Sequence, residues 1–98
     1  MVRTIRWTSR ADRIFTEILE FYYRRSKSKS YSRKLNREID EVLELIKIYP
    51  FLGMSSNVPN TRVFISGHFK IFYEVKPDEI VVQLVWDTRQ DPEKFPLT

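Results

Sequence analysis

The spacing of apolar positions changes twice along this chain, and each change predicts a new kind of element. Residues 2–7 mix β-branched and aromatic residues with basic ones, which predicts a short strand. From residue 9 the apolar positions recur every three or four residues, as on one face of an amphipathic helix. We expect this helix over about 9–25, with Thr8 or Ser9 as its N-cap. Its apolar stripe consists of Ala11, Ile14, Phe15, Ile18, Leu19 and Tyr22.

A second helical stripe follows a short polar segment. Residues 24–30 hold four basic residues and three serines, which is typical of the tip of a helical hairpin. Ser28 or Ser30 is expected to cap the next helix. That helix should end near Ile48, because Pro50 disfavours a helical conformation at the residue before it. Its stripe consists of Tyr31, Leu35, Ile39, Val42, Leu43 and Ile46.

The remaining residues predict a loop and then three strands. Residues 53–60 have loop composition, whereas 62–66, 69–75 and 80–86 alternate with the period of two that is typical of strands. Tight turns at Gly67-His68 and around Pro77 separate the strands. Side chains expected on the helix side of the sheet are Phe69, Ile71, Tyr73 and Val75 in one strand and Ile80, Val82, Leu84 and Trp86 in the last, where Trp86 would close the core beneath the helices.

The predicted element order is therefore β-α-α-β-β-β, in a single domain spanning residues 1–98. Two amphipathic helices must bury their stripes, so we expect an α+β two-layer domain with the helical hairpin packed on an antiparallel sheet. The other sheet face would be partly open, and its basic, semi-apolar surface would be available to a partner. We expect it to present Arg62, Phe64, Lys70, Phe72 and Gln83.

Composition limits the kinds of binding site that the chain can hold and the cellular location that we expect for it. The chain has no cysteine and one histidine, which argues against a disulfide framework and a histidine-rich metal centre, and we expect no metal or cofactor. Neither an apolar run of membrane-spanning length nor an apolar N-terminal signal segment is present in the sequence. We therefore expect a cytoplasmic protein without a membrane partner.

The charge is distributed unevenly, although the net charge is only +4. Residues 1–37 hold 11 basic and 3 acidic residues, whereas residues 38–98 hold 6 and 10. Such asymmetry indicates a polyanionic partner, with a plainly solvated helix surface as the alternative.

The most specific motifs lie near the end of the chain. They are the strand Ile71-Phe72-Tyr73-Glu74-Val75 and the segment Trp86-Asp87-Thr88-Arg89-Gln90-Asp91-Pro92. Together with Ile5-Arg6-Trp7-Thr8, Tyr49-Pro50 and Gly53, they give a pattern that resembles the RelE/ParE superfamily of toxins from type II toxin–antitoxin systems. The resemblance implies the fold predicted above and a cognate antitoxin as partner in a hetero-oligomer. It also implies one of two targets: RelE-like members cleave mRNA on the ribosome, and ParE-like members inhibit DNA gyrase.

The resemblance also implies candidate site residues. Lys70 and Arg89 occupy positions at which RelE-like members place basic residues, and they are the candidates for catalysis through phosphate binding. Residue type adds two candidates for substrate binding: Arg62, as a further positive charge, and His68, the one histidine of the chain. Each has a plain alternative, since exposed strand cations aid solubility and Gly-His is ordinary turn chemistry. We expect Asp87 to pair with Arg89 or with a basic residue of the first strand.

One departure from the RelE-like pattern bears on the reaction. Metal-independent RNA cleavage needs a base for the 2′-hydroxyl and an acid for the leaving 5′-oxygen. RelE-like members use a tyrosine or histidine near the C-terminus, and this chain has neither after Arg89. A ParE-like gyrase inhibitor is therefore favoured. A ribosome-dependent mRNA endoribonuclease and a non-toxic binding module of the same fold remain as alternatives. For the antitoxin, Phe64, Phe72 and the outer helix faces are the candidate contacts.

Overall fold

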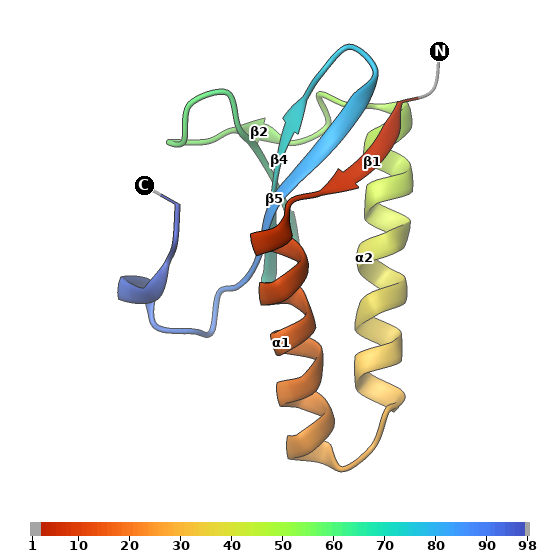
Figure 1. The fold of residues 1–98 in the computed structure, drawn as a ribbon, viewed down its shortest axis with the longest axis vertical. Coiled ribbons are helices and arrows are strands. Elements are labelled where there is room, and N and C mark those ends of the chain that lie inside the picture. The colour runs from red at the N-terminus through yellow and green to blue at the C-terminus, as the bar shows by residue number, and fades with distance from the viewer. Residues whose placement is uncertain (1–2, 98) are drawn as a thin grey trace.

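The computed structural model describes residues 3–97, in which a helical hairpin covers one face of a five-stranded sheet (Figure 1). The elements are β1 (Thr4–Trp7), α1 (Ser9–Ser26), α2 (Ser30–Ile48), β2 (Met54–Ser55), β3 (Arg62–Ser66), β4 (Phe69–Val75), β5 (Glu79–Asp87) and a 3-10 helix, η1 (Pro92–Lys94). This confirms the two-layer α+β class and both predicted helices. Residue 2 of the predicted first strand lies outside the described residues.

Local side-chain chemistry sets the helix ends. The Thr8 hydroxyl accepts a hydrogen bond from the backbone N–H of Ala11 at 3.0 Å, so the predicted N-cap of α1 is confirmed. The N-cap of α2 is Lys29, and it makes no side-chain cap bond. The predicted cap was therefore wrong in position. Ser28 nevertheless contributes, because its hydroxyl accepts the backbone N–H of Ser30 at 3.2 Å.

The sheet is mixed, which corrects the antiparallel prediction. Its strand order is β1-β5-β4-β3-β2, and β1 pairs with β5 in parallel, whereas the other pairs are antiparallel. The period-two pattern reports which face a residue occupies but carries no information on strand direction. β2 was also missed, because this two-residue strand lies in a segment of loop composition and is recognisable only by its pairing with β3.

A β-bulge interrupts the alternation of β5. Phe72 lies opposite Leu84, but the next residue, Tyr73, lies opposite Val82, so Gln83 is an extra residue in the ladder. Side chains after the bulge therefore point to the face opposite from the one that an uninterrupted alternation predicts.

The bulge moves Trp86 away from the helices. The core between the helices and the sheet contains Val85, whereas Leu84 and Trp86 belong to a second cluster on the other sheet face. The prediction that Trp86 closes the core beneath the helices was therefore wrong. The helix-side core consists of Ala11, Phe15, Ile18, Leu35, Ile39, Leu43, Ile46, Phe69, Ile71, Tyr73, Ile80, Val82 and Val85.

The register of the β3–β4 hairpin corrects the predicted open face. The two-residue turn places Phe64 opposite Ile71 and Arg62 opposite Tyr73, so both face the helix side together with their partners. Lys70 does lie on the other face, opposite the exposed Ile65. The predicted turn and strand bounds were right, but the predicted face for Arg62 and Phe64 was wrong, because residues paired across the hairpin share one face.

The chain beyond β5 covers part of the second sheet face (Figure 1). Phe72, Leu84, Trp86 and Leu97 form a buried cluster there, with Phe95 packed against it. Phe72, predicted to be available to a partner, is therefore buried. The polar tail composition concealed this return of the chain, because only two of its residues are large and apolar.

Tyr73 joins the sheet to the loop after α2. Its hydroxyl donates to the carbonyl of Pro50 at 2.8 Å and accepts the buried N–H of Gly53 at 2.9 Å. A Cβ atom at Gly53 would lie 2.7 Å from both this hydroxyl and the carbonyl oxygen of Val63, so the close approach requires glycine. The predicted packing role of Tyr73 is confirmed.

Loss of the Tyr73 hydroxyl should destabilise the protein. Because Tyr73→Phe leaves the buried N–H of Gly53 without its partner, we expect the free energy of unfolding to fall by about 1–3 kcal/mol in urea titrations. Tyr49→Phe is the matched control, since Tyr49 is 59% exposed, and it should change little. Equal losses in both variants would contradict this role of the Tyr73 hydroxyl.

Candidate functional site

The end of β5 brings three polar side chains together beside α1. Asp87 lies opposite Phe69, a residue of the helix-side core, and is only 3% exposed. Tyr22, in the last part of α1, reaches it from the helix layer, and Arg89 follows β5 by two residues. We call Tyr22, Asp87 and Arg89 the strand-end cluster.

Hydrogen bonds close the strand-end cluster on itself. The Asp87 carboxylate accepts the Tyr22 hydroxyl at 2.5 Å, the backbone N–H of Arg89 at 3.0 Å, and the Arg89 Nε and Nη2 groups at 3.0 and 3.2 Å. Arg89 Nη2 also donates to the Tyr22 hydroxyl. Of the two predicted partners for Asp87, Arg89 and a basic residue of the first strand, the structure has Arg89, and a bidentate geometry of this kind fixes the guanidinium plane.

Aromatic rings hold the Arg89 guanidinium from the helix side. Its central carbon lies 5.1 Å from the ring centroid of Tyr22 and 5.8 Å from that of Phe69. Tyr31, from α2, packs edge-to-face on Tyr22 with ring centroids 4.8 Å apart. The side chain of Arg89 is still 43% exposed. It is therefore an anchored cation with access to solvent.

The cluster has shifted protonation equilibria. Burial raises the pKa of Tyr22 to about 12, and its hydrogen bond to Asp87 acts in the same direction. Burial alone would raise the pKa of Asp87, but the hydrogen bonds from Arg89 and Tyr22 outweigh it and hold this pKa below its ordinary value. The hydrogen bond to Asp87 raises the pKa of Arg89. At neutral pH the phenol is thus protonated and the ion pair charged, and none of the three is poised for proton transfer near pH 7.

Lys70 does not join Arg89. It lies on the opposite sheet face, opposite Trp86, and lines a groove of about 650 Å³ between the C-terminal segment and β2–β3. We call this the open-face groove. Its lining is largely apolar and includes Met54, Ile65 and Phe95.

Arg62 and His68 are separated as well. Arg62 donates to the carbonyl of Gly53 through Nε at 3.0 Å and Nη2 at 2.5 Å, and it stacks on Phe51, so it supports the loop before β2. His68 is exposed at the β3–β4 turn, and its carbonyl accepts the backbone N–H and the hydroxyl of Thr88, both at 2.8 Å. Of the four predicted residues, His68, Lys70 and Arg89 lie near one end of the sheet, but Lys70 is on the opposite face from Arg89, and Arg62 lies at the other end of β3.

The sequence matches, over residues 5–92, the family model described as the ParE toxin of the type II toxin–antitoxin system parDE. The chain belongs to the ParE toxin family. This confirms the predicted RelE/ParE relationship. Among solved structures the chain is similar to one described as the chromosomal ParDE TA system from P. aeruginosa, with a TM-score of 0.71 and 19% identity, covering 86% of this chain and 94% of that chain. At that identity the likeness shows the fold. A comparison with curated proteins gives no match.

In this ParE-family chain the sequence reasoning missed Tyr22 as a site residue. Its place in the first helical stripe indicated packing, and its partner Asp87 lies 65 residues away. The available signal was chemical: a tyrosine at the end of an apolar stripe needs a polar partner for its hydroxyl. Among residues 3–97, no group of three side chains suited to holding a metal occurs, and no helix there has the length and apolar character to cross a membrane.

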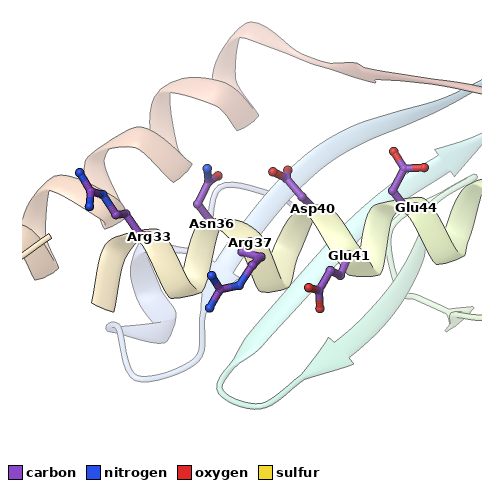
Figure 2. A pocket seen from close by; sticks show the side chains of 6 residues that line it. All are labelled: Arg33, Asn36, Arg37, Asp40, Glu41 and Glu44. Atoms are coloured by element: carbon purple, nitrogen blue, oxygen red, sulfur yellow. The ribbon is translucent and has the colours of Figure 1, made fainter. Parts of the chain in front are cut away.

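A shallow hollow also follows the exposed face of α2 in this ParE-family chain. Figure 2 shows the side chains that line it, which are Arg33, Asn36, Arg37, Asp40, Glu41 and Glu44. The two arginines lie toward the start of α2 and the three acidic residues toward its end. They belong to one helix face with spacings of three and four residues, which is typical of a solvated surface, and we assign them no reaction.

Proposed function

We propose that this protein is the toxin component of a type II toxin–antitoxin pair, that it inhibits DNA gyrase, and that a cognate antitoxin neutralises it. The family match over residues 5–92 is the observation that carries this proposal. It supports a toxin of the ParE kind, and the geometry of the candidate residues adds to that support.

Those residues are arranged for binding more than for cleavage. RNA cleavage needs a base, an acid and cations converging on one phosphate. Here Lys70 and Arg89 lie on opposite sheet faces, and Arg62 is engaged with backbone carbonyls. Arg89 instead offers an oriented, solvent-accessible guanidinium, which is suited to recognising an acidic group on a protein partner.

The open-face groove supports the antitoxin part of the proposal. It exposes Met54 and Ile65 next to the buried Phe72, so it presents apolar surface on a small protein. A helix or strand of an antitoxin would bury this surface. Phe64, predicted as such a contact, faces the helix layer instead.

The test combines growth with purified gyrase. Induced expression should arrest growth, co-expression of a small protein from a neighbouring reading frame should restore it, and saturating toxin should inhibit supercoiling by gyrase. Arg89→Ala should weaken that inhibition roughly 10- to 100-fold, the effect of losing a charged hydrogen bond. Lys94→Ala, which removes an exposed cation from the same tail, should leave it unchanged.

Three results would argue against the proposal. Unimpaired growth would favour a non-toxic binding module. Full gyrase activity at saturating toxin would remove gyrase as the target, and new cut sites in cellular mRNA by primer extension would then favour an endoribonuclease. Equal inhibition by Arg89→Ala, with unchanged thermal unfolding, would remove Arg89 from the interface.

A further inference from the structure

The free end of the helical hairpin carries aromatic side chains paired with cations. Phe21 and Tyr23 are 44% and 43% exposed, although both are large and apolar. The Arg25 guanidinium lies 6.0 Å from the ring centroid of Phe21, and the Lys29 amine lies 6.0 Å from that of Tyr23. In Figure 1 this end of the hairpin projects beyond the sheet. Neither ring belongs to a core cluster, so packing of the core does not explain why large aromatic residues occupy these positions.

A recess of about 340 Å³ lies beside Phe21, between α1 and the chain after β5. Arg25 borders it from the helix and Arg89 from the strand end, and Gln90 adds an amide. Asp87 also borders the recess, but its charge is matched by Arg89. Among residues 3–97, no carboxylate forms an ion pair with Arg25, so the recess keeps a net positive character.

The surrounding charge is mainly of the same sign, although Arg24 pairs with Glu20 and Lys34 with Glu38 at the edges of this segment. Residues 24–37 contain seven basic residues and no acidic one. Along α2 the acidic residues Asp40, Glu41 and Glu44 come only farther from the hairpin tip, as Figure 2 shows. The positive field is therefore concentrated at the end that carries the exposed rings, which favours a polyanion there.

We propose that this end of the hairpin binds single-stranded nucleic acid, with a phosphate held between Arg25 and Arg89 and a base stacked on Phe21. Exposed rings interleaved with cations are the elements by which proteins bind single strands without reading sequence, because every base has a face that can stack. In a duplex the base faces are occupied by neighbouring pairs, and an acidic peptide offers charge without rings. Tyr23 with Lys29 provides a second pair at the same tip. This inference goes beyond gyrase inhibition and does not depend on it.

The test measures binding to the full chain without gyrase. A fluorescein-labelled oligothymidine of about 20 nucleotides should bind in fluorescence anisotropy, and binding should weaken as salt rises. Phe21→Leu keeps the apolar bulk but removes the ring, and it should weaken binding roughly 5-fold or more. Arg25→Gln should weaken binding several-fold and reduce the slope against the logarithm of salt concentration by about 0.7.

The matched control lies on the same helix. Arg13→Gln makes the same charge change at an exposed position about 18 Å farther along α1, and it should leave binding nearly unchanged. All variants should keep the thermal midpoint of the wild type, because the replaced side chains are exposed.

Four results would overturn the inference: no binding of oligothymidine at low salt, equal weakening by Arg13→Gln and Arg25→Gln, wild-type binding by Phe21→Leu, or equally good competition by a duplex or an oligoglutamate of the same charge. The same variants in the supercoiling assay separate this inference from the proposed function. Loss of oligothymidine binding with unchanged gyrase inhibition would confirm single-strand binding at the hairpin tip and would leave the proposed gyrase inhibition unaffected.

Discussion

Replacement of Asp87 by alanine should lower the free energy of unfolding by about 3 kcal/mol. The substitution removes a buried carboxylate that accepts hydrogen bonds from the Tyr22 hydroxyl and from three N–H groups of Arg89. The buried part of this network contributes most of the loss. Arg89 contributes less, because its exposed side chain regains hydration when the carboxylate is absent. Urea titration at neutral pH measures the change.

The stabilisation by Asp87 should disappear in acid. Its pKa is lower in the folded chain than the value near 3.8 expected for the unfolded chain, so folding favours the charged form. The contribution is complete above about pH 5 and is lost as the pH falls through the folded pKa. We therefore expect the difference between wild type and Asp87→Ala to be constant from pH 7 to about pH 5 and to shrink below about pH 4.

In alkali, ionisation of Tyr22 should also lower the free energy of unfolding. Its pKa of about 12 lies above the ordinary value of 10.0, so its contribution to the free energy of unfolding is present below pH 10 and is lost as the pH rises through 12.

Asp40→Ala is the control for Asp87→Ala, because this acidic side chain is exposed on α2. If Asp40→Ala destabilises the protein as much as Asp87→Ala, the strand-end cluster is not a distinct source of stability.

Deletion of residues 92–98 should reduce the free energy of unfolding by about 3–4 kcal/mol. The deleted segment contains Phe95 and Leu97, which cover Phe72 and Trp86 on the second sheet face. The rings of Phe95 and Trp86 pack edge-to-face with centroids 5.3 Å apart, and Phe95 lies 5.2 Å from Phe72. Without them, the indole of Trp86 becomes hydrated, and its fluorescence emission should shift to longer wavelength.

A point substitution tests how much of the effect of the deletion comes from the side chain of Phe95 alone. Phe95→Ala alone should account for about 2 kcal/mol and for much of the fluorescence shift, because this ring packs edge-to-face on Trp86. Lys94→Ala, at the neighbouring exposed position, should change neither quantity. Unchanged emission in the deletion variant would show that the tail does not cover this face in solution.

The helices and the turns were predictable because their signals are local. The stripe from Ala11 to Tyr22 and the cap at Thr8 depend on neighbours three or four residues away, and both appear in α1 as predicted. The Gly67-His68 turn likewise follows from glycine at a left-handed backbone position, with φ of 59°. At the site, the pairing of Asp87 with Arg89 was predictable for the same reason, since two residues separate them.

The sequence by itself therefore determined the two helices, the three long strands, the ParE-like pattern and the choice of Arg89 as the cation at the strand end. The tertiary structure decided the parallel pairing of β1 with β5, the bulge at Gln83, the return of the tail over Trp86, and the hydroxyl of Tyr22 on Asp87. The physical reason is distance along the chain. A pattern with a period of two or 3.6 reports which face a residue occupies, whereas strand direction, register and a partner 65 residues away depend on packing between elements.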